Sequence, residues 1–585
     1  MYKPAAQKRI CMNKKLLLGI AAVAAVVQSL SAQSALGYSV LDINQAHAGV
    51  NSNGALFTNF TTFGPQFEVP ANSNKHTFYA DAMWIGGYDT SGLLHTAAQT
   101  YSQNGVDFFG GPVSSPSAYT TTFDNQWAQV WKINKSQIDS FVTWFANPSV
   151  YPNYTIPAVI TTWPGNGDSN QGQATLLAPF IDLNANGIYE PLQGEYPCMK
   201  GDQMIFAIYN DDRNVHTETG GRKFKAEIHM TVYGFNRPGN WLDSAVFINY
   251  RVYNRSSDDY VNTFVGKWAD FDIGAYGDDY IGSDVLRGMV YGYNGAVNDG
   301  GNSAPGTGTY GANPPAQGIM FLRGPQADTG DGIDNDYDGS TDEPGEYCKV
   351  NRFMYYNNDG SPMGNPTDTT QYYGYMNSYW RDTSPLTYGG NGYGGSTQAH
   401  FMFPGSSDPQ GFGTNMQPQA AWDEASANLM PGDRRGVGTS GPFTFEAGEM
   451  LCLDYAYLYA RGSNGPASSV ARLQQVADST RYWYDPMPPC ACNTISPTGI
   501  NESLTPTRTV SLYPNPASTV VFVNYEVKAA NASWTITDIT GRTVDTGLIA
   551  AGNSSSIYIG TLPAGIYTLR ITDGQTIAQA RLIKQ

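Results

Sequence analysis

The chain has 585 residues, a formal net charge of −17 at pH 7 and a pI near 4.7. This charge repels a phosphate backbone, so nucleic acid is excluded as an expected partner. Charged residues make up only 14% of the chain, which has 64 glycines, 35 prolines and 39 tyrosines. That composition is typical of many short strands joined by turns, and we expect a mainly β protein with several folded units.

The N-terminus has the pattern of a secretory signal peptide. Lys14 and Lys15 precede an apolar run from Leu16 to Val27, and small residues follow as far as Ala32. The run is shorter than the about 20 residues that a spanning helix needs, so we expect export through the periplasm and no transmembrane helix after signal removal. The remaining cysteines would form one or two disulfides in an oxidising compartment, with the pairing left open: Cys198, Cys348, Cys452, Cys490 and Cys492.

The body of the chain shows strand patterns interrupted by long loops. Apolar and polar residues alternate from Phe224 to Tyr253, which predicts half-buried antiparallel strands. Asn134 and Gln137 form the pattern of a capping box and predict one short helix, and a second is expected after Pro466. The sequence therefore predicts a multi-strand antiparallel β body with long Gly/Asn/Tyr-rich loops and a few short helices.

The first candidate metal site is a turn with the sequence DLNANGIYE. Its oxygen-bearing side chains surround Gly187, whose conformational freedom allows a sharp turn, and such hard oxygen ligands suit calcium. The alternative is a turn whose side chains cap backbone amides. The predicted ligands are Asp182, Asn184, Asn186 and Glu190.

The second candidate is the acidic segment DGIDNDYDGSTDE. Carboxylates this close repel one another unless a cation lies between them, although a solvated acidic loop is the alternative. The segment resembles the calcium loops of thrombospondin type 3 repeats, which implies that its aspartates ligate the ion. The predicted ligands are Asp334, Asp336, Asp338, Asp342 and Glu343. A third, weaker cluster in ADFDIGAYGDDYIGSD offers Asp270, Asp272, Asp278, Asp279 and Asp284, of which the first three are the predicted ligands. We expect the calcium to be structural, because bound ions would offset the backbone entropy lost when polar loops become ordered.

Motifs for catalysis are scarce. The six histidines form no HExxH or other close pair, and no GxSxG motif occurs. We predict no catalytic residues and lean towards a protein without enzymatic activity. Facing carboxylates for glycoside hydrolysis remain an open alternative, because their separation is a spatial fact. Tryptophans would serve either core packing or a sugar-binding platform: Trp84, Trp127, Trp131, Trp163 and Trp241.

The last eighty or so residues carry the most specific pattern. They read SLYPNPAS, then VVFVNYEV, SWTITDITGR and TLPAGIYTLRI, and end in ARLIKQ. This order resembles the type A C-terminal sorting domain of the type IX secretion system. The matching positions are Tyr513, Pro514, Asn515, Pro516, Asp538, Gly541, Arg542, Leu562, Gly565, Tyr567 and Lys584. The resemblance implies an Ig-like β-sandwich, recognition by the translocon and sorting machinery, and a secreted or outer-membrane location with removal of the tail or its exchange for lipopolysaccharide.

Five segments of the body read APFIDLNANGIYEP, GEYPCMKGDQ, WADFDIGAYGDDYIGSD, FMFPGSSDPQGFGT and GDRRGVGTSGPFTFEAGE, and they lie between Ala178 and Glu449. They resemble an uncharacterised class of secreted proteins that share this tail, which implies that the body acts as one module. We therefore expect a structural or adhesive surface or extracellular protein. The alternatives are a secreted hydrolase of polysaccharide or protein and a carbohydrate-binding module, for which surface polysaccharide would be a partner. The expected regions are a signal peptide at 1–32, a β-rich region at 33–222, a central β-sandwich-like region at 223–487, a linker at 488–507 and the sorting domain at 508–585.

Overall fold

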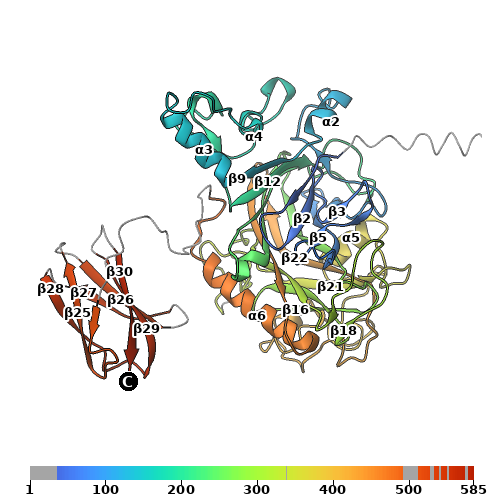
Figure 1. Cartoon of the computed structure of the whole chain (residues 1–585). Coiled ribbons are helices and arrows are strands. Elements are labelled where there is room, and N and C mark those ends of the chain that lie inside the picture. Colours follow the sequence, from blue (N-terminus) through green and yellow to red (C-terminus); the bar gives the residue numbers. More distant parts are fainter. Residues whose placement is uncertain are drawn as a thin grey trace, which may run out of the picture. The chain divides into compact units, whose positions relative to one another are not determined.

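The computed structural model divides the chain into two compact units, Met1–Ile495 and Ser496–Gln585 (Figure 1). It describes residues 36–337, 339–491, 511–527, 532–538, 542–549, 552–572 and 577–585. The predicted signal peptide and most of the predicted linker lie outside these residues. The first unit is called the body below, and the second contains the sorting domain.

The larger sheet of the described body has nine strands and is antiparallel throughout. The strand order is β16-β17-β20-β23-β14-β13-β12-β8, and β9 also pairs with β12. The bounds are β8 Phe109–Gly110, β9 Trp131–Asn134, β12 Gln203–Asn210, β13 Ala226–Gly234, β14 Ala245–Asn254, β16 Asp279–Asp284, β17 Met289–Asn294, β20 Ala316–Arg323 and β23 Met450–Ala460.

The second sheet of the body has five strands in the order β21-β22-β15-β6-β7. Its bounds are β6 Phe78–Asp89, β7 Leu94–Ala98, β15 Tyr260–Phe271, β21 Arg352–Asn357 and β22 Arg434–Phe445. One hydrophobic core contains side chains of both sheets, such as Trp268 from β15 and Ile228 from β13. The two sheets therefore pack face to face, as in a β-sandwich.

The other face of the nine-stranded sheet packs against helices in a second core, which includes Phe206 of β12 and Leu473 of α6 (Gly465–Tyr484). Every residue of β12 and β13 is consequently buried. The expectation of half-buried strands, made for residues 224–253, is wrong for β13. Alternate side chains do face opposite sides, but both sides are covered.

The remaining helices are short. They are α2 Thr121–Trp127, α3 Lys135–Ala146, α4 Ala158–Thr161 and α5 Thr369–Met376, with 3-10 turns η1 Ser169–Gln171, η2 Pro191–Gln193, η3 Trp241–Ser244 and η4 Phe412–Thr414. The predicted capping box at α3 is confirmed: the Asn134 side chain accepts a hydrogen bond from the Gln137 backbone, and the Gln137 side chain accepts one from Asn134. The helices α2, α3 and α4 gather at one end of the body (Figure 1). Among the described residues, none of the helices combines the length and the hydropathy needed to cross a membrane.

Short strands complete the described body. β1 (Tyr38–Leu41), β2 (His47–Asn51) and β5 (Phe67–Glu68) form a three-stranded sheet, and three further pairs are β3 (Thr58–Asn59) with β4 (Gly64–Pro65), β10 (Phe180–Ile181) with β11 (Tyr196–Pro197), and β18 (Asn298–Asp299) with β19 (Gly311–Ala312). Strands from both sides of residue 222 pair in each large sheet, as β12 does with β13 and β6 with β15. Residue 222 therefore does not separate one sheet from another.

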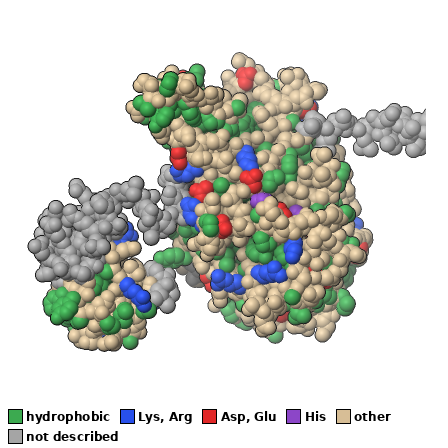
Figure 2. Space-filling model, viewed as in Figure 1, with side chains coloured by type: hydrophobic (Ala, Val, Ile, Leu, Met, Phe, Trp, Pro, Cys, Tyr) green, Lys and Arg blue, Asp and Glu red, His purple; other side chains and the backbone are tan. Residues whose placement is uncertain are grey.

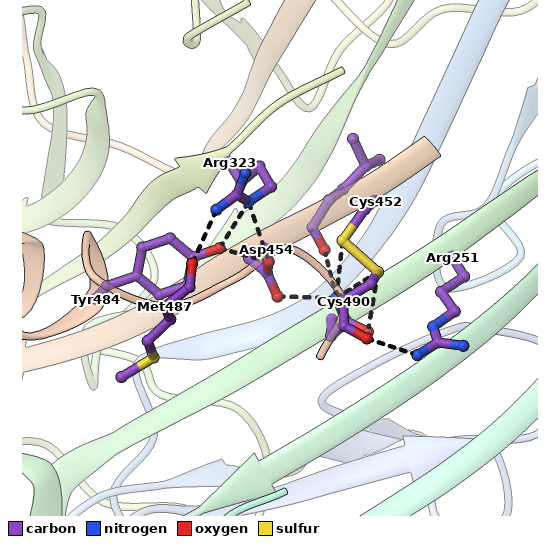
Figure 3. Close-up of a disulfide and its surroundings, with 9 residues drawn as sticks. Arg251, Arg323, Cys452, Asp454, Tyr484, Met487 and Cys490 are labelled. Carbon is purple, nitrogen blue, oxygen red and sulfur yellow. Dashed lines mark hydrogen bonds and ion pairs between the residues drawn. A yellow bond between two sulfur atoms is a disulfide. The ribbon is translucent and has the colours of Figure 1, made fainter. Parts of the chain in front are cut away.

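A disulfide fastens the end of the body to the nine-stranded sheet (Figure 3). It joins Cys452 of β23 to Cys490, whose backbone oxygen accepts a hydrogen bond of 2.7 Å from Arg251. Nearby, Arg323 donates to the Tyr484 hydroxyl and to the Met487 backbone oxygen. Cys198 is also disulfide-bonded, and Cys348 is a buried free thiol. The expectation of one or two disulfides therefore agrees with the structure.

The sorting domain contains two antiparallel sheets around a core of its own. One sheet has the order β24-β25-β28 and the other β27-β26-β29-β30. The bounds are β24 Ser511–Tyr513, β25 Val520–Val527, β26 Ala532–Asp538, β27 Thr543–Ile549, β28 Gly552–Tyr558, β29 Gly565–Thr572 and β30 Ile577–Lys584. The predicted mainly β fold with a C-terminal sandwich is confirmed.

Candidate functional site

The acidic segment predicted to bind calcium forms a loop that is closed at its base. Gln326 and Tyr347 make an antiparallel bridge there, and the Ala327 N–H donates to the Glu346 oxygen at 2.9 Å. This closure brings Glu346 to Asp334 and Asp336, and one carboxylate oxygen of each lies within 4.8 Å of the others. We call these three residues the loop cluster. Oxygen ligands gathered at this spacing are suited to a hard cation such as calcium.

Sequence reasoning missed Glu346 and chose its neighbours instead. The loop cluster contains neither Asp342 nor Glu343; Asp342 instead accepts a hydrogen bond from the Gly332 N–H. Asp338 lies outside the described residues. Burial raises the pKa of Glu346, and the negative charges of Glu343 and Asp336 raise it as well. The bridge at the loop base brings Glu346 to the other two carboxylates. The spacing of acidic residues along the sequence gives no sign of this bridge.

A second group, which we call the strand-end cluster, joins Asp270 and Asp272 to Asp433, again with oxygens within 4.8 Å. Asp270 pairs with Arg435 across β15 and β22, and the guanidinium lies 3.0 Å from the Asp270 carboxylate and 2.7 Å from that of Asp433. Burial raises the pKa of Asp270 to about 7 and that of Asp272 well above its usual range. This cluster therefore has a counter-charge within the fold and also carboxyl groups that hold protons readily.

The strand-end cluster matches the third sequence prediction only in part. Asp278 is not in it, and one Asp278 oxygen accepts a 3.4 Å hydrogen bond from the Gly300 N–H instead. Asp433 was missed because it is more than 160 residues distant from Asp270 in the chain. Only the pairing of β15 with β22 brings it close.

The Asp182 turn brings its predicted residues together as one unit. The Asp182 carboxylate accepts hydrogen bonds from the Gly187 and Asn186 N–H groups, which lower its pKa. The side-chain amides of Asn184 and Asn186 both donate to Glu190. Gly187 has a φ of 72°, as the sharp turn requires. The turn thus has the geometry of the alternative interpretation, in which side chains cap backbone amides. Calcium binding at this turn stays a prediction.

Several residues of the sorting motif hold the terminal sandwich together. Asn515 accepts from the Ile583 N–H at 2.8 Å and donates to the Arg581 oxygen at 2.7 Å, so the motif's opening is tied to the last strand. The Arg542 guanidinium lies 3.1 Å from Asp538. The rest of the motif extends into the core and the strands: Leu562 and Tyr567 are buried, and Gly565 pairs with Lys584. Gly541 lies outside the described residues.

The tryptophans considered for a sugar platform are mostly in the core. Trp84, Trp127, Trp131 and Trp163 are buried, and Trp241 packs against the second core. On the face shown in Figure 2, acidic and basic side chains of the body are interspersed among uncharged ones. Neither observation marks an aromatic sugar platform.

Comparison with known proteins identifies the tail but not the body. The family model of the secretion system C-terminal sorting domain matches residues 511–585. None of the curated proteins compared with the chain matches it. A solved structure of a polysaccharide lyase aligns with 61% of this chain at 8% identity and a TM-score of 0.17, and the alignment spans 34% of that structure's chain, about a third of its length. A likeness this weak supports no conclusion about fold or function. The sorting domain makes this an exported protein, directed out of the cell by type IX secretion.

Proposed function

We propose that the body acts outside the cell as a structural or adhesive protein without enzymatic activity, and that calcium holds its acidic loops in shape. The loop cluster carries the calcium part of this proposal, because three carboxylates meet there. The segment from Ala327 to Glu346 contains no lysine or arginine that could neutralise them from within the loop. A cation from solution would remove the repulsion and substitute for the apolar burial that such a polar loop lacks.

Calcium fits this loop better than magnesium does. Calcium accepts six to eight oxygen ligands in a flexible geometry, whereas magnesium requires a nearly ideal octahedron. The loop offers carboxylates from Asp334, Asp336 and Glu346, and its glycines at 332 and 339 have positive φ values of 73° and 99°. Such turns allow a short chain to wrap around an ion.

The calcium part is tested by thermal unfolding of the mature chain with calcium, with magnesium and after chelation by EGTA. We expect calcium to raise the transition temperature and EGTA to lower it, with little effect from magnesium. Asp336→Asn should reduce the calcium response. The matched control is Asp139→Asn on the exposed face of α3, which should leave the response unchanged. Identical unfolding in calcium and in EGTA would contradict the proposal.

The structural or adhesive role is supported by the architecture and the delivery route. Both large sheets are used for packing, and the chain carries a sorting domain that directs it out of the cell. The proposal predicts that the mature protein binds purified surface polysaccharide or the cell surface without releasing new reducing ends or peptides. Release of either product at a rate that follows protein concentration would favour the secreted-hydrolase alternative instead.

The sorting machinery is the partner that the tail implies. Removing residues 511–585 should leave the body in the periplasm, where immunoblotting of cell fractions would find it. Asp545→Asn within the intact tail is a control, because Asp545 is outside the matched motif positions and its described hydrogen bond is to the neighbouring Thr546 N–H. Normal release of the truncated chain would contradict this route.

A further inference from the structure

A cavity of about 660 Å³ lies between the acidic loop and the second sheet of the body. Its wall includes the loop residues 332–335, 337 and 339–341, with Asp334 among them, and the start of β21 at Arg352. His400, Phe412, Asn415 and Met416 form much of the remaining wall. The volume is within the range of small-molecule sites in proteins, roughly 300–1,000 Å³.

The floor of this cavity contains an arginine whose charge the described protein does not balance. Within the described ranges, the charged groups near Arg352 include no carboxylate, and its buried Nε has no hydrogen-bond acceptor. Its Nη1 donates to the Asn351 backbone oxygen at 2.9 Å, and the guanidinium lies 5.7 Å from the Phe264 ring centre. Burial lowers the pKa of Arg352. Arg352 is half-buried. A partly buried cation is costly unless an anion or other acceptors meet it, so this position is suited to an anionic ligand.

Two neutral polar groups accompany Arg352. Asn351 is 6% exposed, its side-chain nitrogen donates to the Gly441 oxygen, and its Oδ1 has no partner in the part of the chain that the structure describes. The Nδ1 of His400 also has no partner there, and burial lowers the pKa of His400 to about 3, so this ring is neutral. Buried polar atoms are usually hydrogen-bonded, and these two would gain partners from a polar ligand group.

The outer part of the same cavity is apolar. Leu286, Ile333 and Met416 line it and are exposed. Phe412 and Tyr337 also line it and stack on each other with ring centres 4.5 Å apart, so each ring covers one face of the other. Exposed apolar side chains around a polar floor favour a ligand that has an apolar body and one charged end.

We propose that this cavity binds a small carboxylate attached to an apolar body, with Arg352 receiving the carboxylate. The planar guanidinium matches a carboxylate in geometry, and the apolar rim would cover the rest of the ligand. Asp334 shares the cavity wall and belongs to the loop cluster. The carboxylates of the loop cluster would repel an anionic ligand, and a calcium ion bound among them would offset that repulsion. Calcium and the ligand should therefore strengthen each other's binding. This coupling rests on the calcium site proposed above, whereas the role of Arg352 does not.

The test is isothermal titration calorimetry of the mature chain with N-acetyl-L-phenylalanine, and with its neutral amide as the matched ligand. We expect the carboxylate to bind at least about tenfold more tightly than the amide, as a charge-assisted pair implies. Arg352→Met should abolish this difference, and Arg472→Met on the exposed face of α6 should not change it. Equal binding of acid and amide, or no binding of either, would overturn the proposal.

Two further measurements do not depend on the folding of the Arg352 variant. Met416→Glu adds a negative charge at the exposed rim and should weaken carboxylate binding, while Met416→Lys should strengthen it. Galacturonate, a carboxylate with a polar body, should bind more weakly than N-acetyl-L-phenylalanine; tighter binding would overturn the apolar-body assignment. Carboxylate binding that is the same in calcium and in EGTA would refute the coupling and leave the Arg352 site intact, so the two failures can be told apart.

Discussion

The two carboxylate clusters form in different settings. The strand-end cluster of Asp270, Asp272 and Asp433 lies where two paired strands end. The loop cluster of Asp334, Asp336 and Glu346 lies within a single loop. In the strand-end cluster, the register of β15 with β22 places Arg435 opposite Asp270. The loop segment from Ala327 to Glu346 has neither lysine nor arginine. Strand pairing gives the strand-end cluster a counter-charge from the chain itself. Our proposal is that a cation from solution does so at the loop cluster.

The largest expected effect is the loss of the internal counter-charge. Arg435→Met would leave the buried Asp270 without its partner and should lower the free energy of unfolding by about 3–5 kcal/mol in urea denaturation. Arg472→Met, an exposed change, should stay within about 0.5 kcal/mol of the parent. A small loss for Arg435→Met would mean that protonation alone stabilises the strand-end cluster.

Unfolding stability measured as a function of pH shows how far an arginine offsets the cost of burying a neighbouring carboxylate. Glu424 lies 3.3 Å from Arg434, beside Arg435 on β22, yet burial raises its pKa to about 7 from 4.5. Because the native state holds this proton more tightly than the unfolded state, the contribution of Glu424 to stability should be fully present below about pH 4.5. It should be lost as pH rises through about 7, by up to about 3 kcal/mol. Glu424→Gln should remove this part of the pH dependence, measured as the difference between the two unfolding profiles. Parallel profiles would contradict it.

The calcium response should be slightly smaller and confined to the loop. At free calcium about 100 times the Kd, binding would add about 2.7 kcal/mol to the free energy of unfolding. Glu346→Gln should remove most of this increment, and Asp342→Asn should retain it, because the loop cluster includes Glu346 but not Asp342. Unfolding curves with and without calcium give the increment for each variant. If Asp342→Asn removed the increment and Glu346→Gln retained it, the ligands predicted from sequence spacing would be favoured instead.

The smallest expected effect comes from an exposed ion pair, whose charges are hydrated and need neither a buried arginine nor a bound cation. Lys135 and Asp139 lie 2.7 Å apart on α3. Replacing Lys135 with alanine should cost no more than about 0.5 kcal/mol and should not alter the calcium response. A larger loss, measured under the same denaturation conditions, would indicate that charge on this helix has a role beyond the local pair.

Much of the secondary structure could be predicted because it depends on local patterns. The capping box of Asn134 and Gln137 is confirmed, since its partners are three residues apart. The alternation in β13 also identified a strand, but it could not show that helix α6 and neighbouring elements would cover the second face of its sheet. Periodicity reports which side chains share a face, and burial of that face depends on what packs there.

The candidate ligands show the same limit. Asp334 and Asp336 were found because they occupy alternate positions in a turn, with one residue between them. Glu346 required closure of the loop base, and Asp433 required strand pairing over more than 160 residues. Arg352 had no signal in the sequence at all, because an arginine is unusual only when its surroundings partly bury its guanidinium without a carboxylate beside it.

By itself, the sequence determined the strand-rich composition, the acidic turns and the ordered blocks of the sorting domain, all of which depend on residues close together in the chain. Only the tertiary structure decided which acids share a cluster, which of them face an arginine and where a cavity forms. These outcomes depend on distances between distant segments, and those distances are set when the sheets pair and pack.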